Sequence, residues 1–141
     1  MSRCSVSAAV SFGSWWIRCG WLDTVVLRRY FQINSVDGIC LTKLDVLDEL
    51  PEIKVCIAYR QNGKHMINMP FLMSEFNDIE PVYITLPGWQ CSTSGVDSFA
   101  ELPANARAYI AKIEELTGVS VAILSTGAER DDTLILKNPF G

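Results

Sequence analysis

The chain has 141 residues, of which 49% are hydrophobic and 20% charged, which is typical of one globular domain with a sizeable buried core and excludes a disordered chain. The net charge is -4 at pH 7 and the basic residues are scattered, so the composition disfavours a nucleic-acid-binding protein, which needs a basic stripe. The single histidine, His65, has no cysteine at metal-ligand spacing, so no metal site is expected.

Residues 1–19 differ in character from the rest of the chain. Arg3 precedes a short run of small and apolar residues, an order that mimics a secretory signal, but serine and glycine interrupt the run. The run is also shorter than the roughly 20 apolar residues that span a bilayer. We therefore expect neither a signal peptide nor a membrane anchor in this segment.

The cysteines indicate a reducing compartment. There are five, an odd number without a Cys-x-x-Cys pair: Cys4, Cys19, Cys40, Cys56 and Cys91. Two of them, Cys40 and Cys56, lie in apolar, strand-like runs. This usage predicts buried, reduced thiols and a cytoplasmic protein.

A helix and two strands are predicted in the first half of the chain. Apolar residues recur at helical spacing over residues 21–34, which predicts an amphipathic helix. Residues 38–45 form an apolar run that ends on Lys43 and Asp45, typical of a buried strand whose carboxyl end delivers polar side chains to a binding crevice. A helical turn over residues 45–50 and a strand over residues 52–60 are expected to follow.

The second half begins with a hairpin signal. Asn62-Gly63 supplies the positive φ angles of a tight turn, so residues 65–71 are predicted to pair with the preceding strand. Glu114 and Glu115 are expected to be solvated, because consecutive helical positions point apart. The remaining predicted elements are a loop over 71–80, a strand over 81–86, a polar loop over 89–95, a helix over 102–116, and strands over 119–124 and 133–136.

Asp45 has the chemistry to recognise guanine. A carboxylate accepts two parallel hydrogen bonds, and guanine offers two adjacent donors at N1 and its 2-amine, whereas adenine has an acceptor at N1 and no 2-amine. The four-carbon stem of Lys43 can lie along the face of the base while its ammonium stays in water. The alternative is a strand end with two solvated charges.

A second polar triplet, Ser125-Thr126-Gly127, follows the strand predicted over residues 119–124. Gly127 lets the backbone approach a flat ligand closely. Backbone N–H groups and the Ser125 hydroxyl can donate to guanine O6, where adenine presents its own donor amine. The triplet could therefore complete a guanine site.

Seven short motifs connect the chain to a known family. In order they are Gly20-Trp21-Leu22-Asp23-Thr24, Leu41-Thr42-Lys43-Leu44-Asp45-Val46-Leu47-Asp48, Cys56-Ile57-Ala58-Tyr59-Arg60, Leu86-Pro87-Gly88-Trp89, Leu102-Pro103-Ala104-Asn105-Ala106, Ile113-Glu114-Glu115-Leu116-Thr117-Gly118 and Ser125-Thr126-Gly127. On these motifs, the chain from residue 20 onward resembles the final third of a bacterial-type adenylosuccinate synthetase, the GTP-dependent ligase of adenine nucleotide synthesis.

The resemblance implies a fold, a reaction and a site. The fold is α/β, the C-terminal part of a larger, mostly parallel mixed sheet that is flanked by helices and carries a projecting β-hairpin. In the reaction, GTP phosphorylates the 6-oxygen of IMP and the amine of L-aspartate displaces the phosphate, with Mg2+ assisting, in a homodimeric enzyme. The implied GTP-binding residues, which surround guanine, are Lys43, Leu44 and Asp45 on one side and Ser125, Thr126 and Gly127 on the other.

The chain has two parts. Residues 1–19 do not match the family, and residues 20–141 resemble its C-terminal part. Of the family's arginine-rich substrate loop only Arg18 is matched, while Trp15 and Ile17 stand at other arginine positions. No glycine-rich phosphate loop followed by lysine occurs, and the family's catalytic aspartate and histidine are unmatched. We expect a partial ligase with no catalytic residue or Mg2+ ligand of its own, inactive alone. The alternative is a non-catalytic guanine-nucleotide-binding or interaction module.

Overall fold

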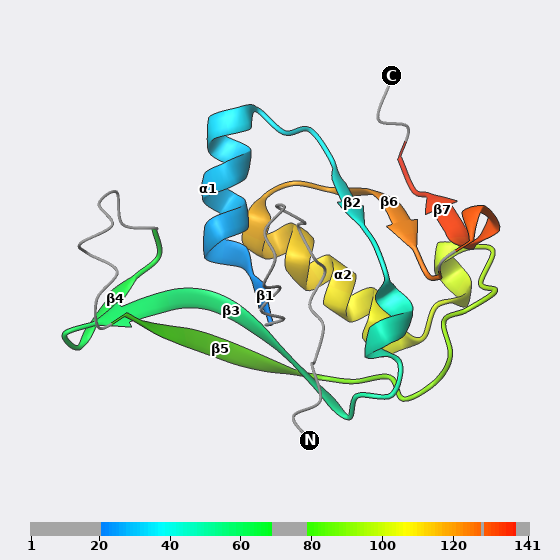
Figure 1. Ribbon diagram of the computed structural model, residues 1–141, viewed down its shortest axis with the longest axis horizontal. Helices are drawn as coiled ribbons and strands as arrows, with labels where there is room; N and C mark the ends of the chain where they lie inside the picture. Colours follow the sequence, from blue (N-terminus) through cyan, green and yellow to red (C-terminus); the bar gives the residue numbers. More distant parts are fainter. Residues whose placement is uncertain (1–20, 69–78, 128, 138–141) are drawn as a thin grey trace, which may run out of the picture.

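The computed structural model describes residues 21–68, 79–127 and 129–137 (Figure 1). In chain order, the elements in these ranges are β1 (Leu22–Asp23), α1 (Thr24–Asn34), β2 (Ile39–Leu41), the 3-10 turn η1 (Leu44–Leu47), β3 (Glu52–Gln61), β4 (Lys64–Met66), β5 (Glu80–Pro87), η3 (Phe99–Glu101), α2 (Ala104–Thr117), β6 (Val121–Ser125), η4 (Arg130–Asp132) and β7 (Thr133–Ile135). The predicted α/β class is confirmed, as is the helical turn expected ahead of Pro51.

β3 is the central strand of the first sheet. β5 runs antiparallel along one of its edges, while β1 (parallel) and β4 (antiparallel) pair with different parts of the other edge. Asn62 and Gly63 connect β3 to β4 with φ angles of 50° and 77°, as a tight hairpin turn requires. Figure 1 shows this end of the sheet projecting from the rest of the molecule, so the predicted hairpin is confirmed.

β4 is shorter than the sequence predicts. Its last paired residue is Met66, opposite Tyr59, and β1 occupies the same edge of β3 further on, which limits the length of β4. Residues 69–78, which hold the end of the predicted strand and most of the predicted 71–80 loop, lie outside the described residues. Glu80 already belongs to β5.

β6 is the central strand of a second sheet, with β2 parallel on one side and β7 antiparallel on the other. The family resemblance implied part of a larger, mostly parallel mixed sheet. The described strands form two mixed sheets, in which β1–β3 and β2–β6 are the parallel pairs. In Figure 1, α2 lies between the β3–β5 ribbon and the second sheet. Val55, Ile110 and Leu124 belong to one core, so the helix joins the two sheets by burying an apolar face of each.

α1 begins at Thr24, three residues later than predicted. Asp23 is the reason, because its Oδ1 accepts hydrogen bonds from the N–H groups of Val25 (2.9 Å) and Val26 (3.1 Å) and so caps the helix. Leu22 and Asp23 themselves pair with β3 as β1. The apolar spacing extends back to Leu22, which is why it predicted a longer helix.

Of the five α2 side chains at core spacing, Ala106, Tyr109, Ile110 and Ile113 are buried and Leu116 is partly exposed. Glu114 is not simply solvated, because its Oε1 accepts a hydrogen bond from Val121 N at 2.7 Å. That bond forms because the chain reverses after α2 and returns as β6. No helix in the described part of the chain is long and apolar enough to cross a membrane.

The cysteines are only partly as predicted. Cys56 on β3 is buried, but Cys40 on β2 and Cys91 in the loop after β5 are exposed. β2 is not a fully buried strand: Leu41 faces the core and Cys40 faces outward, because neighbouring side chains of a strand alternate between its two faces. Cys4 and Cys19 lie outside the described residues.

Candidate functional site

The ends of β2 and β6 bring the two predicted triplets to one edge of the second sheet. The strands are parallel, with Leu41 opposite Leu124, so residues 42–45 and 125–127 follow from paired positions. We call these the 43–45 triplet (Lys43, Leu44, Asp45) and the 125–127 triplet (Ser125, Thr126, Gly127). Ligands of α/β proteins bind beyond the carboxyl ends of strands, so this edge is where a site is expected.

The three residues of the 43–45 triplet lie in different environments. Lys43 has the left-handed backbone conformation (φ 58°), which turns the chain from β2 into η1 and leaves its side chain exposed. Leu44 is 1% exposed and packs in the hydrophobic core. Leu44 therefore anchors the turn, and Lys43 and Asp45 are the side chains near solvent.

Asp45 has a buried oxygen without a partner. The residue as a whole is partly exposed, but its Oδ1 atom is buried. Among the side-chain oxygen and nitrogen atoms of the described residues, it is the one that is buried and makes no hydrogen bond. A buried acceptor left unsatisfied costs about 1 to 3 kcal/mol, and more when it is charged. A fully solvated strand end would not carry this cost, so Asp45 differs from the alternative of a strand end with two solvated charges.

The 125–127 triplet is held by internal hydrogen bonds. The Ser125 hydroxyl donates to the Gly127 carbonyl (2.8 Å), and buried Thr126 donates to the Asp132 carbonyl through its N–H (2.8 Å) and its hydroxyl (3.2 Å). Glu129 N donates to Asp132 Oδ2 (3.2 Å), which fixes the carboxylate. Asp132 is thus an organising residue of this loop that the sequence interpretation missed.

Gly127 also leaves room for a side chain of the same loop. A Cβ atom on Gly127 would lie 2.1 Å from Asp132 Oδ2 and 3.1 Å from Asp132 Cβ. The space that the sequence assigned to a flat ligand is therefore occupied on this side by the Asp132 carboxylate. The Ser125 hydroxyl, expected as a donor to guanine O6, already has an acceptor within the chain.

An open hollow of about 890 Å³ lies beside Asp45. It is bounded on one side by the η1 turn and on the other by the loop after β5, with lining residues Asp45, Val46, Asp48, Glu49, Gln90, Cys91, Ser92 and Ser94. Its volume falls in the range of small-molecule sites, about 300 to 1,000 Å³. The 125–127 triplet does not line the hollow, so a base held by both triplets would sit at the edge nearest Asp45.

Asp48 ties the loop after β5 to the η1 turn. Its Oδ1 accepts hydrogen bonds from Trp89 Nε1 (2.7 Å) and from the Thr93 hydroxyl (2.9 Å), and its Oδ2 accepts from Thr93 N (2.8 Å). The Trp89 ring packs against Tyr109 of α2 with 5.9 Å between ring centroids. The segment predicted as a plain polar loop is therefore anchored in the core.

A buried polar cluster lies near the start of α1. The Tyr59 hydroxyl donates to Asp23 Oδ2. Burial is the larger cause of the raised pKa of Tyr59, and the neighbouring Asp23 carboxylate is the second. The same two causes raise the pKa of Cys56 to about 11. Burial and the raised pKa therefore favour the protonated thiol of Cys56 at neutral pH, which is typical of a structural cysteine and not of a nucleophile.

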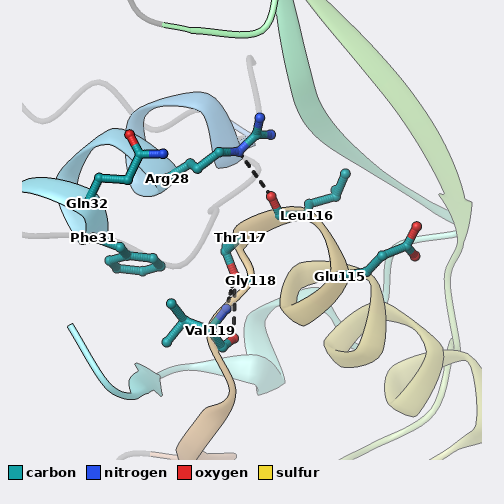
Figure 2. A pocket seen from close by; sticks show the side chains of 8 residues that line it. All are labelled: Arg28, Phe31, Gln32, Glu115, Leu116, Thr117, Gly118 and Val119. Carbon is teal, nitrogen blue, oxygen red and sulfur yellow. Dashed lines mark hydrogen bonds between the residues drawn. The ribbon is translucent and has the colours of Figure 1, made fainter. Parts of the chain in front are cut away.

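A second hollow, of about 540 Å³, lies between α1 and the C-terminal end of α2 (Figure 2). Arg28 Nε donates to the Leu116 carbonyl at 3.1 Å, which places a cation at the negative end of the α2 dipole. Among the described residues, no predicted site residue lines this hollow, and Arg28 acts there as a link between the two helices.

The described residues hold no group of three or more histidine, cysteine, aspartate or glutamate side chains that could bind a metal ion. His65 is on the exposed strand β4 of the first sheet. Arg18, the possible remnant of the substrate loop, lies outside the described residues.

Comparison with known proteins decides the family. The model of the adenylosuccinate synthetase family matches residues 16–134. The chain belongs to the adenylosuccinate synthetase family. The family resemblance carried by the seven motifs is thereby confirmed, and the match leaves residues 1–15 outside the family model.

Relatives in this family are similar over most of this chain but over a minor part of their own length. The adenylosuccinate synthetases of Vesicomyosocius okutanii subsp. Calyptogena okutanii and Alkalilimnicola ehrlichii are 55% and 54% identical over 123 residues, which are 87% of this chain and 28% of each relative. The structure of the fully ligated adenylosuccinate synthetase from Plasmodium falciparum is similar with a TM-score of 0.79 and 36% identity, over 85% of this chain and 29% of that one. The chain thus spans less than a third of the length of these family members.

Proposed function

We propose that this chain carries the guanine-recognising part of a GTP-dependent ligase that joins IMP and L-aspartate to form adenylosuccinate, on the AMP branch of purine nucleotide biosynthesis. The observation that carries the proposal is the buried, unpartnered Oδ1 of Asp45 at the carboxyl end of β2, beside the end of β6. Membership of the adenylosuccinate synthetase family supports the reaction.

Guanine satisfies the unmet acceptor of Asp45. The carboxylate accepts from guanine N1–H and from the 2-amine, and the Lys43 side chain, which is exposed at the same turn, covers the face of the base. The 125–127 triplet supplies donors for guanine O6. The Ser125 hydroxyl donates to the Gly127 carbonyl in the structure, and it turns to O6 when the base is bound. Adenine leaves the carboxylate without its two donors, so it is rejected.

The rest of the proposed reaction depends on groups outside this chain. The 141 residues contain no glycine-rich loop followed by lysine for the triphosphate, and His65 lies on the hairpin sheet and not at the candidate site. Binding of IMP, L-aspartate and Mg2+, the catalytic groups, and assembly as a cytoplasmic homodimer are therefore assigned to a complete family member. By itself the chain is inactive.

A non-catalytic guanine-nucleotide-binding or interaction module is the second candidate. It is favoured by the combination of a candidate base site with the lack of a phosphate loop in the same chain. The two candidates differ in one outcome: a partial ligase restores turnover when it is joined to the upstream part of a relative, and a diverged module does not.

The test uses a chimera in which residues 21–141 follow the upstream part of the Alkalilimnicola ehrlichii relative. In this chimera, Asp45→Asn replaces one acceptor by an amide donor, which opposes the guanine 2-amine but matches the 2-oxygen of xanthine. The charge-assisted hydrogen bond to the 2-amine is lost and the one to N1–H becomes neutral, which costs GTP at least about 1.5 to 3 kcal/mol, while xanthosine triphosphate gains activity. Asp37→Asn, at an exposed loop position ahead of β2, is the control.

The opposite responses of the two nucleotides are the decisive feature. General destabilisation lowers turnover with both nucleotides, and only a direct contact with the base exchanges one preference for the other. A variant that loses both equally, or that keeps its preference for GTP, overturns the assignment of Asp45.

A further inference from the structure

We propose that Asp48 is a positioning residue for guanine recognition, because its carboxylate fixes the turn that carries Asp45. The proposal rests on the function proposed above, since Asp48 affects base selectivity through the position of Asp45. It assigns to the loop after β5 a role in base selectivity that its polar sequence did not suggest.

Asp48 is bonded to the recognition turn and to the loop at the same time. Its backbone N–H donates to the Asp45 carbonyl at 3.1 Å and so closes the η1 turn. Its carboxylate accepts one hydrogen bond from Trp89 and two from Thr93, between 2.7 and 2.9 Å. A single residue therefore connects Asp45 to a segment more than 40 positions along the chain.

The groups that hold Asp48 are themselves fixed. Thr93 is fully buried, and Trp89 is 8% exposed and packs against Tyr109, which is 2% exposed. The Asp48 carboxylate is thus anchored to the hydrophobic core. Anchoring of this kind is what holds a recognition group in its working geometry, within about 0.5 Å.

Asp45 needs this support because its own buried oxygen has no hydrogen bond within the described residues. The position of its carboxylate is therefore set by the backbone of the turn. Recognition of two adjacent donors by two oxygens is more sensitive to a shift than recognition of one donor. Inosine has the N1–H of guanine and lacks the 2-amine, so the preference for GTP over ITP measures the alignment of Asp45.

The experiment measures kcat and KM of the chimera described above with GTP and with ITP. Asp48→Ala removes all three side-chain acceptor contacts. We expect it to lower kcat/KM for GTP about 100-fold, mainly through KM, and to lower the preference for GTP over ITP about tenfold, with the KM values for IMP and L-aspartate unchanged. Asp48→Asn keeps one oxygen for Trp89 and the Thr93 hydroxyl, so its preference lies between those of the wild type and Asp48→Ala.

Two further variants complete the design. Asp37→Ala removes an exposed aspartate of the same chain and leaves the preference unchanged. Trp89→Phe removes one donor to Asp48 and keeps an aromatic ring against Tyr109. If Asp48→Ala fails to fold, Trp89→Phe takes its place and shifts the preference in the same direction by a smaller factor.

The outcomes separate this proposal from the one on which it rests. Equal losses with GTP and ITP in the Asp48 or Trp89 variants mean that Asp48 is only structural, and they overturn the positioning role. Asp45→Asn is measured in parallel. If Asp45→Asn keeps its guanine preference, the proposed function itself fails, whereas if Asp45→Asn loses it and Asp48→Ala does not, only the positioning role is refuted.

Discussion

Asp45 and Asp48 lie three residues apart in one turn, and the structure predicts opposite effects on stability when each is replaced by asparagine. Asp45 Oδ1 is buried without a partner, so removal of the charge relieves a desolvation cost. We expect Asp45→Asn to raise the free energy of unfolding by about 1 kcal/mol, because the amide remains polar and recovers only part of the cost of about 1 to 3 kcal/mol.

Asp48→Asn has the reverse sign. The new amide nitrogen replaces the oxygen that accepts from Thr93 N, so a donor faces a donor and a charge-assisted hydrogen bond is lost. The expected cost is about 1.5 to 3 kcal/mol. Asp37→Asn, at an exposed position, changes stability by less than about 0.5 kcal/mol.

Thermal and urea unfolding of the 141-residue chain without nucleotide measures both effects. For a chain of this size, 1 kcal/mol corresponds to a shift of about 3 to 5 °C in Tm. Most substitutions destabilise, so a gain at Asp45 beside a loss at Asp48 is diagnostic. If Asp45→Asn destabilises the chain as much as Asp48→Asn does, the Asp45 carboxylate has a partner and the inference from its unmet acceptor is refuted.

Three further predictions concern other parts of the chain. Gly127→Ala should lower the free energy of unfolding by about 1 to 3 kcal/mol because its Cβ overlaps the Asp132 carboxylate. Asp132→Ala has its own cost because it removes the acceptor of Glu129 N, so in urea unfolding the double variant should lose less than the sum of the two single losses, and additive losses would contradict the overlap. Folding favours the protonated form of Tyr59, because its pKa is raised in the folded chain. Its contribution to the free energy of unfolding is therefore complete below about pH 10 and declines as the pH rises above that value. Tyr59→Phe should weaken this decline in unfolding curves measured between pH 8 and 11, and an unchanged pH dependence would show that Tyr59 is not its source. The chain supplied with GTP, IMP, L-aspartate and Mg2+ should form no adenylosuccinate above background, and turnover in the usual range of about 1 to 1,000 per second would show that it contains catalytic groups we have not recognised.

Local signals in the sequence predicted the parts of the fold that depend on neighbouring residues. Asn62-Gly63 specified the hairpin turn, since a two-residue turn requires its own φ angles and little else. The spacing of apolar residues located the buried face of α2. It misplaced the start of α1, because the cap at Asp23 and the pairing of β1 with β3 end the helix where the apolar pattern does not.

The chemistry of single side chains predicted the candidate site, but the contacts that support the site depend on the tertiary structure and were missed. The carboxylate of Asp45 indicated guanine recognition, but its burial without a partner depends on packing that no local pattern encodes. The Asp48 contacts join segments 41 and 45 positions apart. The carboxylate of Asp132 occupies the space beside Gly127 because η4 folds back on the strand end. Neither aspartate has a sequence signal that distinguishes it from a solvated acid.

The most direct test of guanine recognition is a crystal structure of the chimera with GDP bound. The decisive measurement is the pair of distances from the two Asp45 carboxylate oxygens to guanine N1 and to the 2-amine nitrogen. We predict both to be about 2.7 to 3.0 Å, as in charge-assisted hydrogen bonds. A structure in which guanine binds elsewhere, with Asp45 Oδ1 still buried and without a donor, would contradict the assignment.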